Sequence, residues 1–325
     1  MKPFKTLCGV VLLSVAVGAA QAQSKGDDAP RVARLIAGGA PGSVADMLAR
    51  PMAEALTRQG GANYIVENRP GPAGFLSVGE LLKAPANGQT LLVISATQVA
   101  WNQFLFKKPP YDPEADIIPT AMLASIPMML VVRDGFPARN YDELIALLKK
   151  NPGKYNYAFG GTGTPSHISF ERFRAATGVA VVPVPYKSGP NALQDLIGGQ
   201  TDMMLDGVPL LDVHVKSGKL RVMAMATRNR SEAYPGIPTI AEKGNPDFDA
   251  GIWVGLGVKK GTAPEVVNRL NADINKALDV PAVREGYARM GAELRKLGVR
   301  EMAQFVAQER ANWGPVIRGA NISLD

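Results

Sequence analysis

Residues 31–56 read RVARLIAGGAPGSVADMLARPMAEAL, and this stretch decides the fold. Apolar residues dominate positions 31–36, which predicts a short buried strand. In positions 44–56 they recur at spacings of three and four, which predicts a helix with one apolar face. A strand followed at once by an amphipathic helix is the start of a β-α-β unit.

The next residues repeat this alternation. Residues 64–66 predict a second strand, the turn-rich stretch NRPGPAG follows at residues 68–74, and a helix then runs to Leu82. The strongly apolar residues 90–94 predict a third strand. Strands that are joined one after another by helices lie parallel in a sheet, with helices on both of its faces.

The remainder of the chain shows a second alternation of the same kind. We expect strands at residues 128–132, 155–159, 179–184, 220–227 and 251–258, and helices at residues 141–150, 166–176, 191–197, 263–278 and 302–313. At roughly 150 residues per domain, the length predicts two α/β domains. Since no low-complexity linker divides the chain, we expect continuous strands to cross between them as a hinge, with a ligand cleft at the carboxyl ends of the strands.

The composition excludes several classes of protein. Of 325 residues, 46% are hydrophobic and 20% are charged, which excludes a disordered or collagen-like chain. The formal net charge is +7, but Lys and Arg are interspersed with Asp and Glu and only 6% of residues are aromatic. This pattern lacks the basic, aromatic-lined groove of a nucleic-acid binder, so no nucleic-acid partner is expected.

The N-terminus has the parts of a secretory signal peptide. Lys2 and Lys5 precede an apolar run at residues 7–17, which is too short to span a bilayer, and Ala20-Gln21-Ala22 matches a cleavage site. We therefore expect residues 1–22 to be a signal peptide and the mature protein to be periplasmic. Cys8, the only cysteine, lies within this leader, so the mature chain is expected to fold without disulfides.

The first candidate site is the loop APGSVAD at residues 40–46, between the first strand and the first helix. Ser43 and Asp46 have the spacing of a capping box, in which the hydroxyl accepts a backbone N–H and the carboxylate reaches back. This loop is either a ligand-binding helix N-terminus or simply a well-capped helix.

The second candidate site is the loop GGTGTPSH at residues 160–167. Thr164 is expected to be an N-cap with Pro165 at the first helical position, and the glycines before it allow several N–H groups to converge on one point. Convergent N–H groups at a helix N-terminus bind anions, although a tight turn explains the same residues. The loop matches neither nucleotide-binding fingerprint.

A third loop, VPYKSGP at residues 184–190, carries Lys187 and is a weaker candidate for anion contact.

Residues for catalysis are scarce. The chain has two histidines, His167 and His214, and neither a nucleophile-elbow motif nor a zinc-protease motif. His167 and Glu171 lie four residues apart, but two ligands do not make a metal site, so no metal, cofactor or catalytic residue is expected.

Six segments together resemble a known family. They are PGSVADMLAR at residues 41–50, VENRPG at 66–71, GGTGTPSH at 160–167, VPYKSG at 184–189, GKLRVMA at 218–224 and PTIAE at 238–242. In this order they are similar to the signatures of the substrate-binding proteins of tripartite tricarboxylate transporters, the Bug family. The resemblance covers essentially all of the chain that follows the leader.

This resemblance implies a two-domain periplasmic binding protein of the Venus flytrap kind, type II-like, whose hinge consists of crossing strands. One domain would comprise residues 23–124 and 227–325, and the other residues 125–226. The protein would capture a small carboxylate as a monomer and deliver it to the membrane permease subunits of the transporter. Two other functions stay open: a sensor subunit that presents its ligand to a signalling receptor, and a periplasmic enzyme that uses Asp46 or Asp206 as a base.

Members of the family hold the ligand carboxylate mainly through backbone groups and ordered waters in the two strand-to-helix loops. The ligand-binding residues that this implies are Pro41, Gly42, Ser43, Asp46, Ser95, Thr97, Gln98, Thr162, Gly163, Thr164, Ser166, His167 and Asp206. One departure concerns the ligand: where the family usually has Pro and then an aromatic residue, this chain has Gly38 and Gly39, and Ser43 replaces a family glycine. We expect this to loosen one wall of the pocket.

Overall fold

The computed structural model describes residues 32–231 and 233–325. The expected leader at residues 1–22 lies outside the described residues. Among the helices that are described, none is long and apolar enough to cross a membrane.

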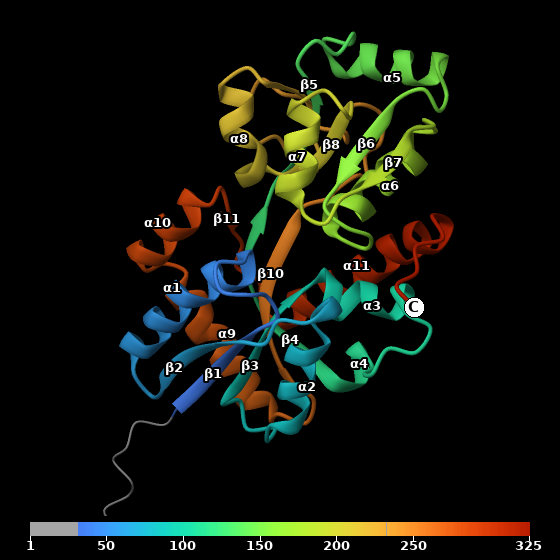
Figure 1. Cartoon of the computed structure of the whole chain (residues 1–325). Helices are drawn as coiled ribbons and strands as arrows, with labels where there is room; N and C mark the ends of the chain where they lie inside the picture. The colour runs from blue at the N-terminus through green and yellow to red at the C-terminus, as the bar shows by residue number, and fades with distance from the viewer. Residues whose placement is uncertain (1–31, 232) are drawn as a thin grey trace, which may run out of the picture. The chain divides into compact units, whose positions relative to one another are not determined.

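The first sheet has six strands (Figure 1). In spatial order they are β11 (Glu293–Leu294), β4 (Ile117–Ile126), β10 (Ile252–Lys259), β3 (Thr90–Ser95), β1 (Val32–Ala37) and β2 (Asn63–Asn68). Strands β1, β2 and β3 are parallel, as the sequence predicts, whereas β10 is antiparallel to both β3 and β4. The predicted β-α-β-α-β unit is therefore confirmed as one side of this sheet.

Helices cover the first sheet on both faces, as expected for parallel strands. The helices are α1 (Val44–Gln59), α2 (Phe75–Lys83), α9 (Pro264–Ala277), α10 (Pro281–Arg289) and α11 (Val299–Gly319). Short turns η1 (Pro72–Gly74) and η2 (Thr97–Trp101) and short helices α3 (Asn102–Leu105) and α4 (Pro113–Asp116) connect the strands. Leu48 and Met52 of α1 are fully buried because they lie on the predicted apolar face.

The second sheet has five strands. In spatial order they are β7 (Val182–Pro185), β6 (Asn156–Phe159), β8 (Met203–Gly207), β5 (Met128–Arg133) and β9 (Leu220–Met225). Its helices are α5 (Tyr141–Lys150), α6 (Pro165–Thr177), α7 (Gly189–Ile197) and α8 (Val208–Lys216). Residues 179–181 were expected to begin a strand, but β7 begins only at Val182. Four further elements, β4, β8, α8 and α10, are not predicted by the sequence patterns.

Two crossings join the sheets; consecutive strands form the first, as predicted, whereas a segment with no regular strand among its described residues forms the second. Strand β4 ends at Ile126 and β5 begins at Met128, so Pro127 alone separates them. The chain returns between β9 and β10 through residues 226–251, which we call the crossing segment. The two crossings run side by side, because the N–H of Ala226 donates to the carbonyl of Met128 (2.9 Å). The α/β fold is thus confirmed, and crossing strands are confirmed at the first crossing, while the domain boundaries at 124/125 and 226/227 stay a prediction.

Candidate ligand-binding site

The first loop of the site follows β1 and leads into α1. Ser43 caps the helix: its Oγ accepts the N–H of Asp46 at 3.4 Å. The Asp46 carboxylate reaches back to the N–H of Gly42 (2.9 Å), one residue before the N–H that a capping box uses. Gly42 has a φ of +82°, which favours glycine at this turn.

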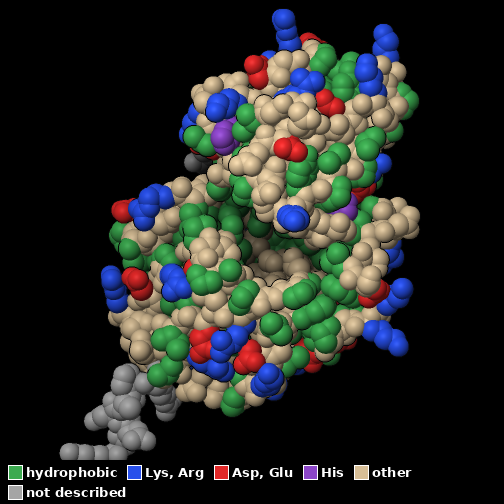
Figure 2. All heavy atoms as spheres, viewed as in Figure 1, with side chains coloured by type: hydrophobic (Ala, Val, Ile, Leu, Met, Phe, Trp, Pro, Cys, Tyr) green, Lys and Arg blue, Asp and Glu red, His purple; other side chains and the backbone are tan. Residues whose placement is uncertain are grey.

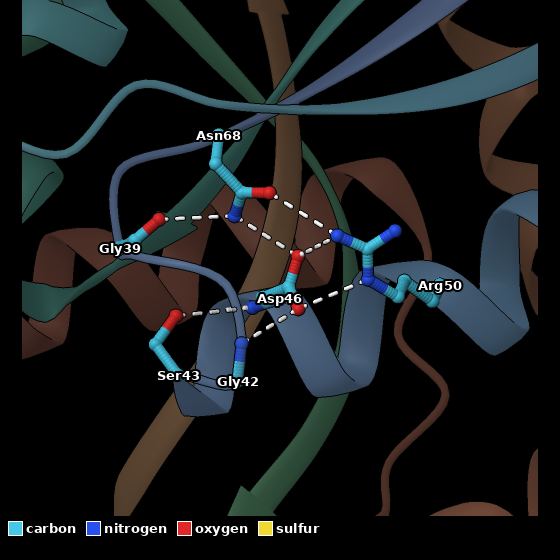
Figure 3. Close-up of polar contacts among 6 residues, drawn as sticks. All are labelled: Gly39, Gly42, Ser43, Asp46, Arg50 and Asn68. Carbon is cyan, nitrogen blue, oxygen red and sulfur yellow. Dashed lines mark hydrogen bonds and ion pairs between the residues drawn. The ribbon is translucent and has the colours of Figure 1, made fainter.

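Asp46 is held by four donors beneath this loop (Figure 3). Besides Gly42, Arg50 donates two hydrogen bonds (2.7 and 3.0 Å) and the amide of Asn68 donates one (2.9 Å). The same amide donates to the carbonyl of Gly39, so the network ties the end of β2 to the loop. Burial disfavours the ionised form, but these hydrogen bonds outweigh it and lower the pKa of the Asp46 carboxyl.

The structure therefore gives Asp46, which is 3% exposed, a role in supporting the loop. A direct contact between Asp46 and a ligand stays a prediction. Arg50 and Asn68 are not among the site residues expected from the sequence, although Asn68 belongs to the VENRPG segment that carries the resemblance.

The end of β3 adds a second element to the side of the site that the first loop forms, which we call the first wall. Gln98, 8% exposed, accepts hydrogen bonds from both the N–H and the Oγ of Ser95 (3.0 and 2.7 Å) through Oε1. Its Nε2 lies beside two glycines: an added Cβ at Gly74 would stand 2.5 Å from it, and one at Gly38 3.4 Å. No other described residue accepts a hydrogen bond from this Nε2, so it is an open donor.

Gly38 and Gly39, where the resemblance implies a departure from the family, are sterically confined. A Cβ at Gly39 would lie 2.2 Å from the Oγ of Ser43, and one at Gly38 would lie 2.8 Å from the Oγ of Ser77. The hydroxyl of Ser43 thus occupies the space that a side chain at Gly39 needs. The two departures are coupled, and whether they loosen the pocket wall stays a prediction.

The second loop follows β6 and leads into α6. As predicted, Thr164 is the N-cap and Pro165 is the first helical residue; the Oγ1 of Thr164 accepts the N–H of His167 (3.5 Å). Gly163, with a φ of +77°, donates its N–H to Nδ1 of His167 (3.2 Å). Gly160 permits a close approach, because a Cβ there would lie 2.3 Å from the backbone nitrogen of Gly189.

His167 and Glu171 have separate partners. The His167 ring stacks on Phe159 with centroids 4.2 Å apart, and burial lowers its pKa, so the ring is neutral and Nδ1 is the acceptor. Glu171 accepts hydrogen bonds from Tyr157 and from Arg174 (2.7 Å). Across residues 32–231 and 233–325, no group of three His, Cys, Asp or Glu residues is placed to hold a metal ion.

Asp206 lies where β8 ends, next to the starts of α6 and α7. These elements form the opposite side of the site, which we call the second wall. Ser166 of α6 donates to the carbonyl of Leu205 (2.7 Å), and an added Cβ at Gly189 would stand 3.8 Å from Oδ2 of Asp206. Burial raises the pKa of Asp206 to about 6, against the opposing hydrogen bond from the N–H of Gly207. The ends of β6, β7 and β8 therefore meet, as the carboxyl ends of parallel strands do.

At their base, the first and second walls both adjoin the two crossings. A Cβ added at Gly207 would lie 3.6 Å from the side chains of Ile126 and Ile252, one from each crossing. Figure 2 shows that this face of the molecule is hollowed, between the part that carries α1 and α3 and the part that carries α6 and α7. In the described part of the chain, no hydrogen bond or ion pair joins the loop at residues 38–46 to the loop at residues 160–167.

Comparison with known proteins decides the family. The family model described as "Tripartite tricarboxylate transporter family receptor" matches residues 48–322. The chain belongs to this family. The receptor is 32% identical to the protein BugT of Bordetella pertussis over 320 residues, which are 98% of each chain. The resemblance found in the sequence is thus confirmed.

Two solved structures share the receptor's fold. A Rhodopseudomonas palustris protein solved with adipate has 29% identity and a TM-score of 0.77, over 92% of this chain and 100% of that one. MatC from Rhodopseudomonas palustris, solved with malate, has 28% identity and a TM-score of 0.72, over 88% of this chain and 99% of that one.

Proposed function

We propose that this receptor captures a small organic anion with at least one carboxylate in the cleft between the two sheets. The periplasm is its proposed location, and the membrane subunits of a tripartite tricarboxylate transporter are the proposed destination of the ligand. The observation that carries the proposal is that each wall presents a helix N-terminus, α1 and α6, preceded by a loop with left-handed glycines.

Electrostatics favour an anion between these helices. The first N–H groups of a helix have no acceptor within the helix, and the macrodipole places partial positive charge there. In α1 these groups include the N–H of Val44 and Ala45, and in α6 that of Ser166. The open Nε2 of Gln98 adds a side-chain donor, so backbone and amide groups together can hold a carboxylate without a cationic side chain.

The relatives support this ligand class. Adipate and malate, named for two of the solved relatives, are both dicarboxylates. A molecule with a carboxylate at each end suits two N-termini that belong to different walls. We therefore propose dicarboxylates as the first ligands to test, with direct contacts from residues 41–43, Gln98 and residues 162–166.

We also propose that the receptor has no catalytic step. Asp46 is a poor general base, because the donors around it stabilise its ionised form. Asp206, with a pKa of about 6, is better suited to accept a proton, but the N–H of Gly207 already donates to its carboxylate, and the hydroxyl of Ser166 donates to the carbonyl of Leu205. Proton NMR of adipate and malate incubated with the receptor should show unchanged spectra.

A thermal-shift screen tests the binding proposal. A ligand that binds only the folded state adds about 2.7 kcal/mol to stability at a hundredfold excess over Kd. We expect dicarboxylates such as adipate and malate to raise the Tm and adipamide, which has the same length as adipate but no charge, to leave it unchanged. A set of mono-, di- and tricarboxylates without any responder would count against carboxylate capture.

A further inference from the structure

Helix α6 carries a second feature, two turns beyond the candidate ligand loop. Arg172 is 9% exposed, and its guanidinium donates to the carbonyls of Asp249 (2.8 Å) and Asp247 in the crossing segment. Its Cζ also lies over two rings, 4.7 Å from the centroid of Trp313 and 5.2 Å from that of Phe248. A buried cation between aromatic faces is held more firmly than an exposed one.

These contacts join elements of the two sheets. Helix α6 packs on β8 of the second sheet, whereas Trp313 lies on α11, which packs on β4 of the first sheet. Figure 1 shows α6 beside α11, and residues of the two helices are in contact. Arg172, itself on a helix of the second sheet, therefore contacts the first sheet's longest helix and the segment that crosses between the sheets.

Glu309 stands on the other side of Trp313. Its Oε2 accepts the indole N–H of Trp313 (3.2 Å) and that of Trp253 (2.8 Å), which is the second residue of β10. Burial raises the pKa of Glu309 to about 7; the two indole hydrogen bonds and the positive charge of Arg172 oppose this shift. Arg172, Trp313, Glu309 and Trp253 thus form a continuous set of contacts, which we call the α6 joint.

We propose that Arg172 is a positioning residue for ligand capture: the α6 joint fixes the helix whose N-terminal loop binds the ligand. Thr164 and Arg172 are eight residues apart on one helix, which places them roughly 12 Å apart along its axis. A rigid helix transmits a displacement at one end to the other, so loss of the joint displaces the loop at residues 162–167. The ligand class in this inference rests on the proposed function, whereas the first two tests below need no ligand.

The charge of Glu309 provides a readout of the joint. Glu309 lines a cavity of about 700 Å³, to which Pro127 and Gly251 of the two crossings also contribute, and this gives its carboxylate access to solvent protons. The other charged residues that line this cavity are Arg228, Arg230, Asp249, Glu293, Arg295 and Glu301. Arg230 is paired with Glu242 (2.9 Å), and Arg295 lies over the ring of Phe305.

The first test follows tryptophan fluorescence from pH 5 to pH 9 without ligand. The wild-type protein should show a transition near pH 7, and Glu309→Gln should remove it. Arg172→Met should move the midpoint upward, because the cation that favours ionised Glu309 is lost, whereas Arg172→Lys should keep it near the wild-type value. Arg174→Met, the same change on the same helix outside the joint, is the matched control and should not move it.

The second test follows hydrogen exchange of the ligand loop, again without ligand. The N–H of Gly163 is bonded to His167, so its exchange reports whether the loop keeps its position. It should exchange faster in Arg172→Met than in the wild type, with partial recovery in Arg172→Lys. An unchanged fluorescence midpoint together with unchanged exchange in folded Arg172→Met would overturn the proposal.

The third test measures affinity by calorimetry with adipate and malate as probes. For a probe that binds the wild-type protein, Arg172→Met should weaken binding about tenfold, equivalent to 1.4 kcal/mol, and Arg172→Lys should weaken it less. Equal affinities would overturn the positioning role. If neither probe binds the wild type, the proposed ligand class fails, while the fluorescence and exchange results still decide the inference about Arg172.

Discussion

Substitution of Gly163 by alanine tests the central feature of the candidate site, a ligand loop that depends on its backbone conformation. Gly163 has a φ of +77°, and its N–H donates to Nδ1 of His167 at 3.2 Å. A Cβ at this position would also lie 2.8 Å from Cδ1 of Leu324. Alanine therefore meets both backbone strain and a steric conflict at one position.

The size of the effect follows from these two terms. A non-glycine residue in the left-handed region costs roughly 1–2 kcal/mol. If the free loop relaxes to avoid this strain, it also gives up the hydrogen bond to His167, worth about 1 kcal/mol. Ligand binding must then restore the strained conformation, so we expect Gly163→Ala to weaken binding about tenfold, since about 1.4 kcal/mol corresponds to that factor.

Calorimetry with adipate or malate measures this loss, and Gly153→Ala is the matched control. Gly153 has a φ of +72°, is exposed, and has open space around a Cβ, so alanine there should lower stability through backbone strain alone, by roughly 1–2 kcal/mol, without changing affinity. Adding Leu324→Ala to Gly163→Ala should recover the part of the loss that is due to the steric conflict. Equal affinities of Gly163→Ala and Gly153→Ala would refute the role of the loop backbone.

Three further predictions concern the charged and polar groups. Gln98→Glu keeps the acceptor for Ser95 but replaces the open donor with negative charge, so calorimetry should show that dicarboxylate binding is lost, while thermal melting shows a folded protein. Asp46→Asn should lower the free energy of unfolding in urea at pH 7 by about 1–3 kcal/mol, because Arg50 loses its charged partner. Since folding lowers the pKa of Asp46, this difference between variant and wild type should disappear as the pH falls below about 4. For Glu309, folding raises the pKa to about 7, so its contribution to stability is present below about pH 4.5 and is lost as the pH rises through 7. In urea unfolding, the free energy of unfolding of Glu309→Gln should therefore increase relative to that of the wild type over this range, by roughly 3 kcal/mol at most. A difference that stays constant with pH would contradict the raised pKa.

The first half of the first sheet was predictable because local patterns alone define it. Strands β1 and β3 are short apolar runs, and α1 has its apolar residues on one face, so periodicity identifies all three. The start of α6 was equally predictable, since Thr164 and Pro165 are local signals for an N-cap and a first helical residue. Both loops of the candidate site follow from these elements.

Strand β8 and helix α8 show where local patterns fail. Strand β8 has five residues and ends in Asp206 and Gly207, which are poor strand formers. Helix α8 buries only Val208 and Leu211 while Val213 is exposed, so its apolar residues do not mark a single buried face. Strand β8 lies between β6 and β5, which both occur far earlier in the sequence, and α8 packs on β8 and β9.

The role of Asp46 was hidden for a related reason. Its spacing from Ser43 indicates a local cap, and a local cap needs no other partner. Its partner Asn68 lies 22 residues further along, at the end of β2, and is brought close only because β1 and β2 are parallel neighbours. A sequence pattern identifies such a carboxylate as a site residue without showing whether it contacts the ligand or supports the loop that does.

The contacts of α6 link the candidate ligand loop to the first sheet at two places. At the N-terminal end, Gly163 lies against Leu324, whose N–H donates to the carbonyl of Leu105 in α3 (2.9 Å). Two turns later, Arg172 lies against Trp313 of α11. A ligand that changes the position of the loop must therefore change the strength of both contacts, and by thermodynamic linkage a change in either contact must alter ligand affinity by the same free energy. Substitutions at Leu324 and Trp313, neither of which is among the residues proposed to contact the ligand, should thus alter affinity through α6, and their effects should fail to add in the double variant because one rigid helix carries both.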